Sequence, residues 1–462
     1  MRLDRAGPDG KRERDALLTL SLTELAEYLA IAAAWVVTII ATGRRPSPFY
    51  VALAAQSFVV IGAIRLAQTG RATGHSVVVL VVGFCALAAG YSYARSSRLP
   101  GRVAVRSKSD ERRPIRRSRE ARRGARAVFV FFALLAAYHF AVVGLPILAP
   151  NVEIARWNFT QSGLFGLPGR AYLYGLPLAL VLARAARLGE TESRPDWLYR
   201  AALAALVLSR VVGGFKGEVL EVVVLVYILQ VGRSSSVTLA AVLRRYAVPA
   251  AVALVFAGSV SQLYLSMQSK PGTASPASQL ASRMTTTAAR APLTAIEYRD
   301  GGGLLTPRVT FVHDVENYVR SITGARDTAP LFGSMLSARM YGRDVYTRGN
   351  TPGTLIVPVA SGAFSVLYYN FGIGAYFAIF LIGAVFAVGE ERVRRARTPL
   401  ALSVSSVFLF VLYQFLMKED FAELLVNWSA MVAVACAVYV IANKWPRVAP
   451  RPAMPTVNWS ES

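Results

Sequence analysis

Apolar positions along the chain are gathered into long runs, which short polar or basic segments separate. The longer runs hold roughly 18 to 25 mostly apolar residues, the length that a helix needs to cross a hydrocarbon core about 30 Å thick. The sequence therefore predicts an all-α fold, a polytopic transmembrane helical bundle of about 10–12 spans with one long, partly helical external loop. The expected spans lie near residues 20–42, 49–67, 74–94, 127–148, 170–187, 199–213, 218–232, 246–266, 372–389, 400–417 and 425–443.

Basic residues set the expected orientation of these spans. Segment 95–126 is dense in arginine, and such segments stay in the cytoplasm in multi-spanning proteins. The later loops then alternate, which puts segment 267–371 outside. The expected divisions are an N-terminal tail (1–19), N-terminal spans (20–94), a basic cytoplasmic loop (95–126), central spans (127–266) with a charged hairpin (206–221), a large external cap loop (267–371), C-terminal spans (372–443) and a cytoplasmic tail (444–462).

The side on which the N-terminus lies stays open. Three spans are expected before the basic loop, so parity places the N-terminus outside. The tail "MRLDRAGPDGKRERD" is itself basic, however, and prefers the cytoplasm. Either the helices of the first hundred residues are miscounted, or one apolar run does not cross fully.

Composition narrows the class of protein further. The chain has 462 residues, 54% of them hydrophobic, and a net charge of +24. In a soluble protein this charge would suggest nucleic acid as a partner, but basic cytoplasmic loops explain it here, so no nucleic acid is expected. The two cysteines, Cys85 and Cys436, both lie in apolar runs, which speaks against a disulfide framework or a thiolate metal site.

The predicted external loop reads as an ordered cap over the outer face. It contains turn signals such as "KPGTASPAS" and "RGNTPGT", and helix-like pieces such as "TFVHDVENYVRSIT". Loops of this length are usually functional or disordered. Its excess of basic over acidic residues suits an anionic ligand; alternatively, it is a solvated loop whose charges have no specific partner.

The hairpin "LVLSRVVGGFKGEVLEVVVLVYILQ" carries Arg210, Lys216, Glu218 and Glu221 around three glycines. Its two apolar arms are too short to cross comfortably at a rise of about 1.5 Å per residue, so the turn must lie below the outer surface. Irregular backbone at that depth faces protein or a wet cavity, and charges there are costly unless paired. One interpretation is an ion cluster in which Lys216 pairs with a glutamate and closes the hairpin. The other, which we favour, is a recessed anion site that includes Arg210 and Lys216.

Two further groups of arginines lie in the expected outer loops. Arg156, in "NVEIARWNFT", presents a planar fork that suits phosphate oxygens, or else anchors the interface together with Trp157. Arg339 and Arg343, in "SMLSARMYGRDV", share one face if the segment is helical, with a tyrosine between them. Tyrosine beside arginine suits a sugar–phosphate ligand; alternatively, neighbouring acids neutralise these arginines on a solvated face. We expect them to complete the anion site within about one pocket width, roughly 10–15 Å, of Lys216 and Arg156.

Three segments resemble a known family. They are "GLPILAPNVEIARWNFTQSGLFGLPGRAYLYGLPLAL", "GGFKGEVLEVVVLVYI" and "SGAFSVLYYNFGIGAYFAIFLIGAVFAV". In this order they are similar to the arginine-bearing stretch, the Gly-Ser-Arg-Gly helix start and the Asn-Phe-Gly helix start of oligosaccharide repeat unit polymerases, the O-antigen polymerase group. Phe215 and Lys216 stand where that group has Ser and Arg.

The resemblance implies a membrane glycan polymerase, a metal-independent glycosyltransferase of the bacterial cytoplasmic membrane. It would join polyprenyl-pyrophosphate-linked oligosaccharide repeat units at the outer face, in contact with membrane lipid. The activated donor makes an ATP site unnecessary, and no cofactor is expected. A flippase and a chain-length regulator are the protein partners that it implies. The alternatives are a ligase of the same class, a transporter or flippase for an anionic lipid-linked glycan, or a non-catalytic scaffold.

Two residues are candidates for the general base that such a reaction needs. His313 lies beside Asp314 in the outer loop, and the ordinary pKa of histidine near neutrality suits proton transfer. A surface histidine without a role is the alternative. Glu218 is the second candidate, because burial raises the pKa of a carboxyl group.

Overall fold

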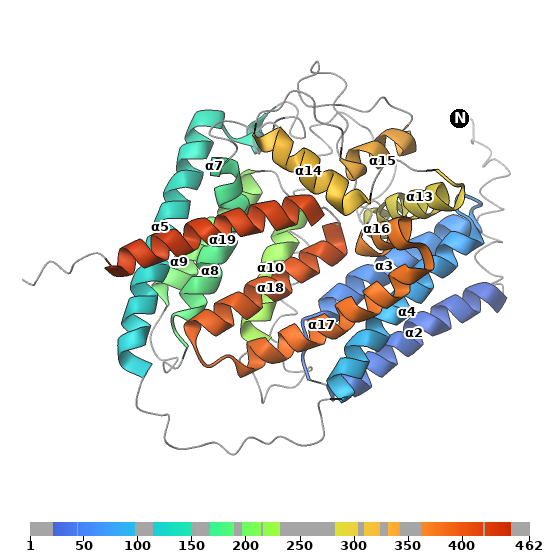
Figure 1. Cartoon of the computed structure of the whole chain (residues 1–462), viewed down its shortest axis with the longest axis horizontal. Helices are drawn as coiled ribbons and strands as arrows, with labels where there is room; N and C mark the ends of the chain where they lie inside the picture. The colour runs from blue at the N-terminus through green and yellow to red at the C-terminus, as the bar shows by residue number, and fades with distance from the viewer. Residues whose placement is uncertain are drawn as a thin grey trace, which may run out of the picture.

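The computed structural model describes twelve stretches of the chain and is helical wherever it has regular structure. The described residues are 22–43, 45–97, 114–149, 155, 167–188, 196–213, 216–231, 282–303, 309–323, 331–341, 362–418 and 421–444. Within them no residue is in a strand. The expected all-α class is therefore confirmed (Figure 1).

Long helices occupy the expected spans. Seven helical stretches of the described chain are long and apolar enough to cross a membrane, so the chain is a multi-span membrane protein. Their principal helices are α2 (Leu22–Thr42), α3 (Phe49–Gln68), α4 (Gly74–Ser96), α5 (Pro114–Val143), α17 (Ala375–Arg395), α18 (Pro399–Lys418) and α19 (Phe421–Lys444). The expected span 246–266 lies outside the described residues.

Shorter helices fill the middle of the chain. One stretch, expected as the span 170–187, is built of α7 (Leu167–Arg170), the π-helix η4 (Ala171–Gly175) and α8 (Leu176–Ala185). The hairpin arms are α9 (Trp197–Val212) and α10 (Lys216–Val231), each 16 residues long. At about 1.5 Å per residue each described arm spans about 24 Å, less than a hydrocarbon core of about 30 Å.

The segment expected as the external cap is also helical where it is described. Its elements are the π-helix η5 (Arg283–Thr287), α13 (Ala288–Asp300), α14 (Thr310–Ile322), α15 (Phe332–Tyr341), α16 (Gly362–Phe371) and the 3-10 turn η6 (Gly372–Gly374). The predicted helix in "TFVHDVENYVRSIT" is α14. The helix predicted around Arg339 is α15, and Arg343 lies outside the described residues.

Helices α4 and α17 form a parallel pair. A Cβ at Gly83 would meet Ile379 at 3.4 Å, and farther along Arg95 donates a hydrogen bond to Glu391 at 2.9 Å. Between these points a Cβ at Gly90 would lie only 1.9 Å from the backbone oxygen of Phe380. The backbones therefore touch, and the C-terminal ends of both helices lie at the same face of the bundle. Both ends lead into arginine-rich sequence, so we call this face the basic end.

The cap helices lie at the opposite face, which we call the outer end after the predicted topology. The first turn of α4 contacts α13 there: Glu297 accepts a hydrogen bond from the Thr73 backbone N–H at 3.0 Å. His75 Nε2 lies 3.2 Å from an Asp300 carboxylate oxygen. Tyr368 of α16 donates to the other oxygen of Asp300 at 3.0 Å. The described part of segment 267–371 is thus separated from the basic loop by the length of α4.

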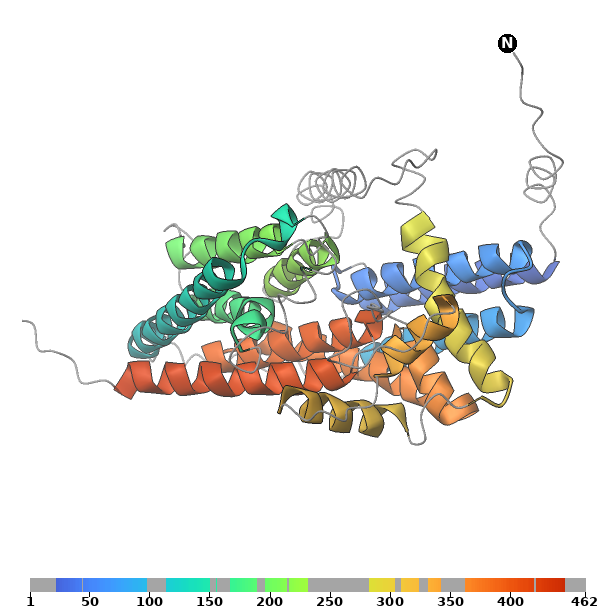
Figure 2. The ribbon, with the colours of Figure 1, turned by 90° about the horizontal axis from the view of Figure 1, so that it is seen from above.

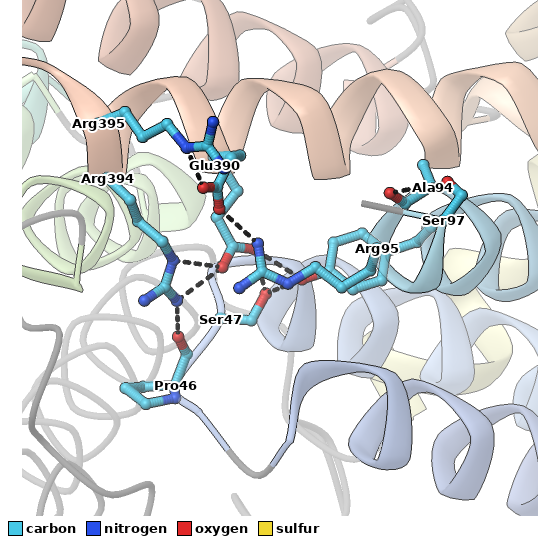
Figure 3. A network of polar contacts seen from close by, with 10 residues as sticks. Pro46, Ser47, Ala94, Arg95, Ser97, Glu390, Arg394 and Arg395 are labelled. Atoms are coloured by element: carbon cyan, nitrogen blue, oxygen red, sulfur yellow. Dashed lines mark hydrogen bonds and ion pairs between the residues drawn. The ribbon is translucent and has the colours of Figure 1, made fainter. Parts of the chain in front are cut away.

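A buried ion cluster fixes the basic end (Figure 3). Glu390 of α17 is only 1% exposed. One of its carboxylate oxygens accepts from Ser47 Oγ at 2.5 Å and Tyr91 Oη at 2.7 Å, and the other accepts from Arg394 at 2.7 and 3.0 Å. Arg394 also donates to the backbone oxygen of Pro46. Every charged group is paired, as burial requires, and the turn between α2 and α3 is held against α17.

Candidate functional site

Helix α14 turns its polar face inward. Thr310, His313 and Asn317 are buried, whereas Val312 and Val319 are exposed. A helix on the surface of a soluble domain shows the opposite arrangement, with its apolar stripe facing the core. Helix α14 therefore covers polar groups, and its outward face carries Val312 and Val319 together with the ion pair of Glu316 and Arg320.

Those polar groups lie on α19 and η4. The amide nitrogen of Asn427 donates to the Tyr318 hydroxyl of α14 at 2.9 Å. The Tyr174 hydroxyl donates to Glu423 at 2.7 Å. The guanidinium of Arg170 lies 5.9 Å from the centre of the Tyr318 ring, within reach of a cation–π contact. The first turns of α19 and the start of the η4–α8 stretch therefore meet beneath α14.

The network continues across the bundle to the charged hairpin. Trp428 Nε1 donates to the amide oxygen of Gln414 on α18 at 2.8 Å. The amide nitrogen of Gln414 in turn donates to Glu221 of α10 at 2.8 Å. The Trp428 ring packs edge-on against Tyr174, with centroids 5.6 Å apart. Figure 2 shows α14 on one side of α18 and α19, with α9 and α10 on the other, so the network passes between them.

Arg210 joins this region through the π-helix. Its guanidinium donates to the backbone oxygen of Leu173 at 2.5 Å and lies 5.6 Å from the centre of the Tyr172 ring. In an α-helix the oxygen of Leu173 would accept from residue 177, but Pro177 has no N–H to give. The π-turn and the proline thus create an acceptor that the buried arginine, 3% exposed, can use. Such π-bulges often mark functional sites.

We call these groups the polar layer. It consists of Arg170, Tyr174, Arg210, Glu221, Tyr318, Gln414, Glu423, Asn427 and Trp428. Six different helical stretches contribute to it, all near the outer end. Ionisable groups inside a bundle of spans are expensive and usually functional.

Burial raises the pKa of two groups of α14. It raises the pKa of Tyr318 to about 12, and the nearby charge of Glu423 acts in the same direction. The Tyr318 hydroxyl therefore keeps its proton. Burial also raises the pKa of the Asp314 carboxyl group to about 7, although that carboxyl accepts from the Phe332 N–H at 3.0 Å.

The candidate residues named from the sequence are only partly brought together. Arg210 belongs to the polar layer. His313, 8% exposed, lies on α14, with Nδ1 3.4 Å from the amide nitrogen of Asn317. Arg339 is exposed on α15, 5.3 Å from the centre of the Tyr298 ring.

The other candidate side chains are not described. Lys216 and Glu218 lie in the first turn of α10, but their side chains are outside the described residues. Arg156 and Arg343 lie outside the described residues altogether. The expected distance between the arginines of α15 and Lys216 or Arg156 stays a prediction.

Sequence reasoning missed most of the polar layer. Tyr318, Gln414, Glu423, Asn427 and Trp428 were not singled out. A usable signal was present for two of them, since Gln414 and Asn427 are amides inside apolar runs, where polar groups need a partner. Nothing in the sequence pairs Tyr318 with Asn427, because that contact depends on how α14 packs on α19.

Comparison with known proteins adds no relative: no protein-family model, curated protein or solved structure matches the chain.

Proposed function

We propose that this multi-span membrane protein is a glycan polymerase, which transfers an oligosaccharide from a polyprenyl-diphosphate carrier to the hydroxyl of another repeat unit. The observation that carries the proposal is the polar layer itself. It combines the buried Arg210 and the partly buried Arg170 with phenol, amide and carboxylate groups at the outer end, beneath a helix whose buried side is polar. Two of the three segments that resemble the polymerase group, at η4–α8 and α10, contribute Tyr174 and Glu221 to it.

The proposed glycosyl transfer needs three kinds of side chain: cations, aromatic rings and a general base. The bond between the first sugar carbon and the diphosphate oxygen breaks, and cations stabilise the charge that develops on the leaving diphosphate. Arg210 and Arg170 supply such charge, and Lys216 and Arg156 are the further candidates. Aromatic rings such as Trp428 and Tyr174 suit the faces of sugars.

The third group is the base. The acceptor hydroxyl attacks the same sugar carbon, and its proton passes to a general base. His313 on the inward face of α14 is the first candidate, and Glu218 in the first turn of α10 is the second. Helix α14 lies over the layer and limits access of water, which would otherwise compete with the acceptor as nucleophile.

The test is a reaction with purified components. The chain, in phospholipid nanodiscs, is supplied with a polyprenyl-diphosphate-linked oligosaccharide, and products are separated by mass. We expect longer glycans and release of free polyprenyl diphosphate. Transport of the intact substrate across liposomes without a new glycosidic bond would instead establish a transporter. Transfer to a different lipid-anchored acceptor, without polymer, would establish a ligase.

Arg210→Gln gives the matched comparison with Arg184→Gln. Both guanidinium groups lie 5.6 Å from the centre of a tyrosine ring, but that of Arg184 packs on Tyr199, away from the polar layer. Loss of a charge-assisted contact of about 1.5–3 kcal/mol should slow transfer roughly 10- to 150-fold in Arg210→Gln. Arg184→Gln should leave the rate near that of the wild type. Equal rates in the two variants would remove Arg210 from the site.

A further inference from the structure

A second feature lies in the half of the bundle nearer the basic end. A cavity of about 580 Å³ opens between α5, α8, α18 and α19. Apolar side chains line almost all of it, among them Val181, Leu400, Val404 and Val432. The one serine in the lining, Ser403, donates to the backbone oxygen of Pro399 at 2.9 Å and so has its own partner. We call this cavity the apolar groove.

The groove is open toward the surroundings of the bundle. Leu400 is 71% exposed, and Val404 and Val440 are exposed as well. These positions lie on helices that cross the membrane, so the groove faces hydrocarbon and a lipid chain can enter it sideways. At its far end the ring of Tyr439 fills the space that a side chain at Gly124 would need, with a ring carbon 2.3 Å from the ideal Cβ position. α5 and α19 are in contact there, which closes that end of the groove.

Three helical stretches contribute both to the polar layer and to the lining of the apolar groove. The η4–α8 stretch, α18 and α19 carry Tyr174, Gln414 and Trp428 near the outer end and line the groove farther down. From Trp428 the groove begins about 6 Å away, at Val432, and ends about 18 Å away, at Val440, at about 1.5 Å per residue. The layout, a polar layer above a long apolar groove, is that of a site for an amphiphile.

We infer that the groove binds the hydrocarbon tail of the lipid-linked donor, as a single long isoprenoid chain whose diphosphate head lies in the polar layer. The inference rests on the proposed function and names the part of the substrate that the groove selects. One leaflet is about 15 Å deep, half of a hydrocarbon core of about 30 Å. A long chain whose head lies in the layer fills the groove as far as Val440, whereas a short tail leaves its far part empty.

Cys436 provides a probe inside the groove. It lines the cavity and is exposed, and Cys85 is the other cysteine of the chain. In Cys85→Ala protein in phospholipid nanodiscs, the rate at which a membrane-soluble maleimide alkylates Cys436 reports occupancy. The added ligands are a long polyprenyl diphosphate and geranyl diphosphate, which has the same head and a short tail.

The two ligands should differ clearly in how much they slow the alkylation of Cys436. At about ten times its Kd, the long polyprenyl diphosphate should slow alkylation about tenfold, whereas geranyl diphosphate should leave the rate near that in phospholipid alone. The matched control carries Cys436→Ala and Ala437→Cys, which moves the thiol one residue along α19 to an exposed position that does not line the groove. Its alkylation should not respond to either ligand.

Equal protection by the two diphosphates, or equal protection at position 437, would overturn the inference and leave phospholipid as the ordinary occupant. Val404→Trp gives a second measurement: it fills the exposed mouth of the groove and should abolish the protection without lowering thermal stability. Protection that survives this change would also overturn the inference. The readout is binding alone, so chain-selective protection without glycan transfer would keep the groove and reject the polymerase. Glycan transfer without chain-selective protection would keep the polymerase and reject the groove as the site of the tail.

Discussion

Glu390 and Glu391 are neighbours on α17 with opposite surroundings. Glu390 is buried and accepts hydrogen bonds from Ser47, Tyr91 and Arg394, whereas Glu391 pairs with Arg95 and Arg395 nearer the surface. Removing one member of a buried pair leaves the other charge without compensation, while partly exposed pairs contribute little. The two positions therefore separate the effect of burial from that of charge.

We expect Glu390→Gln to destabilise the folded protein by about 3–5 kcal/mol, because the amide cannot balance the charge of Arg394. Glu391→Gln should cost at most about 1 kcal/mol. Thermal or denaturant unfolding of the purified protein in one detergent compares the two variants directly. A cost for Glu390→Gln as small as that for Glu391→Gln would mean that water reaches the cluster.

Asp314 predicts a dependence of stability on pH. Burial raises the pKa of its carboxyl group to about 7 in the folded state, while the unfolded value is about 3.9. A raised folded pKa stabilises the protein fully below about pH 4, and this contribution is lost as the pH rises through about 7. We therefore expect the cap helices to unfold at a lower temperature at pH 8 than at pH 5.

Asp314→Asn isolates that contribution. The amide oxygen can still accept from the Phe332 N–H but does not ionise over this range. We expect the variant to lose most of the pH dependence of the unfolding temperature between about pH 4 and 8. A variant with the full dependence of the wild type would assign it to other groups.

Among the elements, the α4–α17 pair shows how glycine sets the distance between two helices. A Cβ at Gly383 would lie 2.2 Å from the backbone oxygen of Leu87, whereas a Cβ at Gly389 on the same helix would meet only side-chain atoms, the nearest at 3.4 Å. Backbone cannot move aside as a side chain can, so the two glycines should respond differently to the same methyl group.

We expect Gly383→Ala to destabilise the protein by about 1–3 kcal/mol through overpacking. Gly389→Ala should be neutral or stabilising by up to about 1 kcal/mol, because alanine favours the helix. Unfolding temperatures of the two variants in the same detergent measure the difference. Equal behaviour would mean that the helices separate at little cost.

The limits of sequence reasoning also appear among the elements. Spans were predictable because the length and polarity of an apolar run decide whether a helix can cross, and the expected 49–67 and 425–443 became α3 and α19 within a few residues. The inward orientation of the polar face of α14 was not predictable from the sequence. The periodicity of a helix shows that it has two faces, but it does not say which face is covered. Arg210 and His313 stood out as ionisable groups in informative places. Their neighbours Tyr174 and Glu423 did not, because their pairing depends on tertiary packing.

At the scale of the whole molecule, the contacts tie the two ends of the bundle to different loops. The α2–α3 turn and the C-terminal ends of α4 and α17 meet at the basic end, while the α3–α4 loop and α13 meet at the outer end. Three long apolar helices, α2, α3 and α4, precede the basic loop. Because α2 ends at the basic end, Leu22 lies toward the outer end, as the parity of the expected spans requires.

The absolute orientation follows from arginine content and can be measured with two matched substitutions. Arg71 lies in the α3–α4 loop and Arg397 between α17 and α18, and both are exposed. In a chain with Cys85→Ala and Cys436→Ala, an impermeant thiol reagent applied to intact cells should label Arg71→Cys and not Arg397→Cys, since arginine-rich loops stay in the cytoplasm. Both should label after permeabilisation, which controls for access. The reverse pattern would place the polar layer at the cytoplasmic face. A donor presented in the outer leaflet could then not reach Arg210, and the proposed polymerase would fail while the geometry of the layer stood.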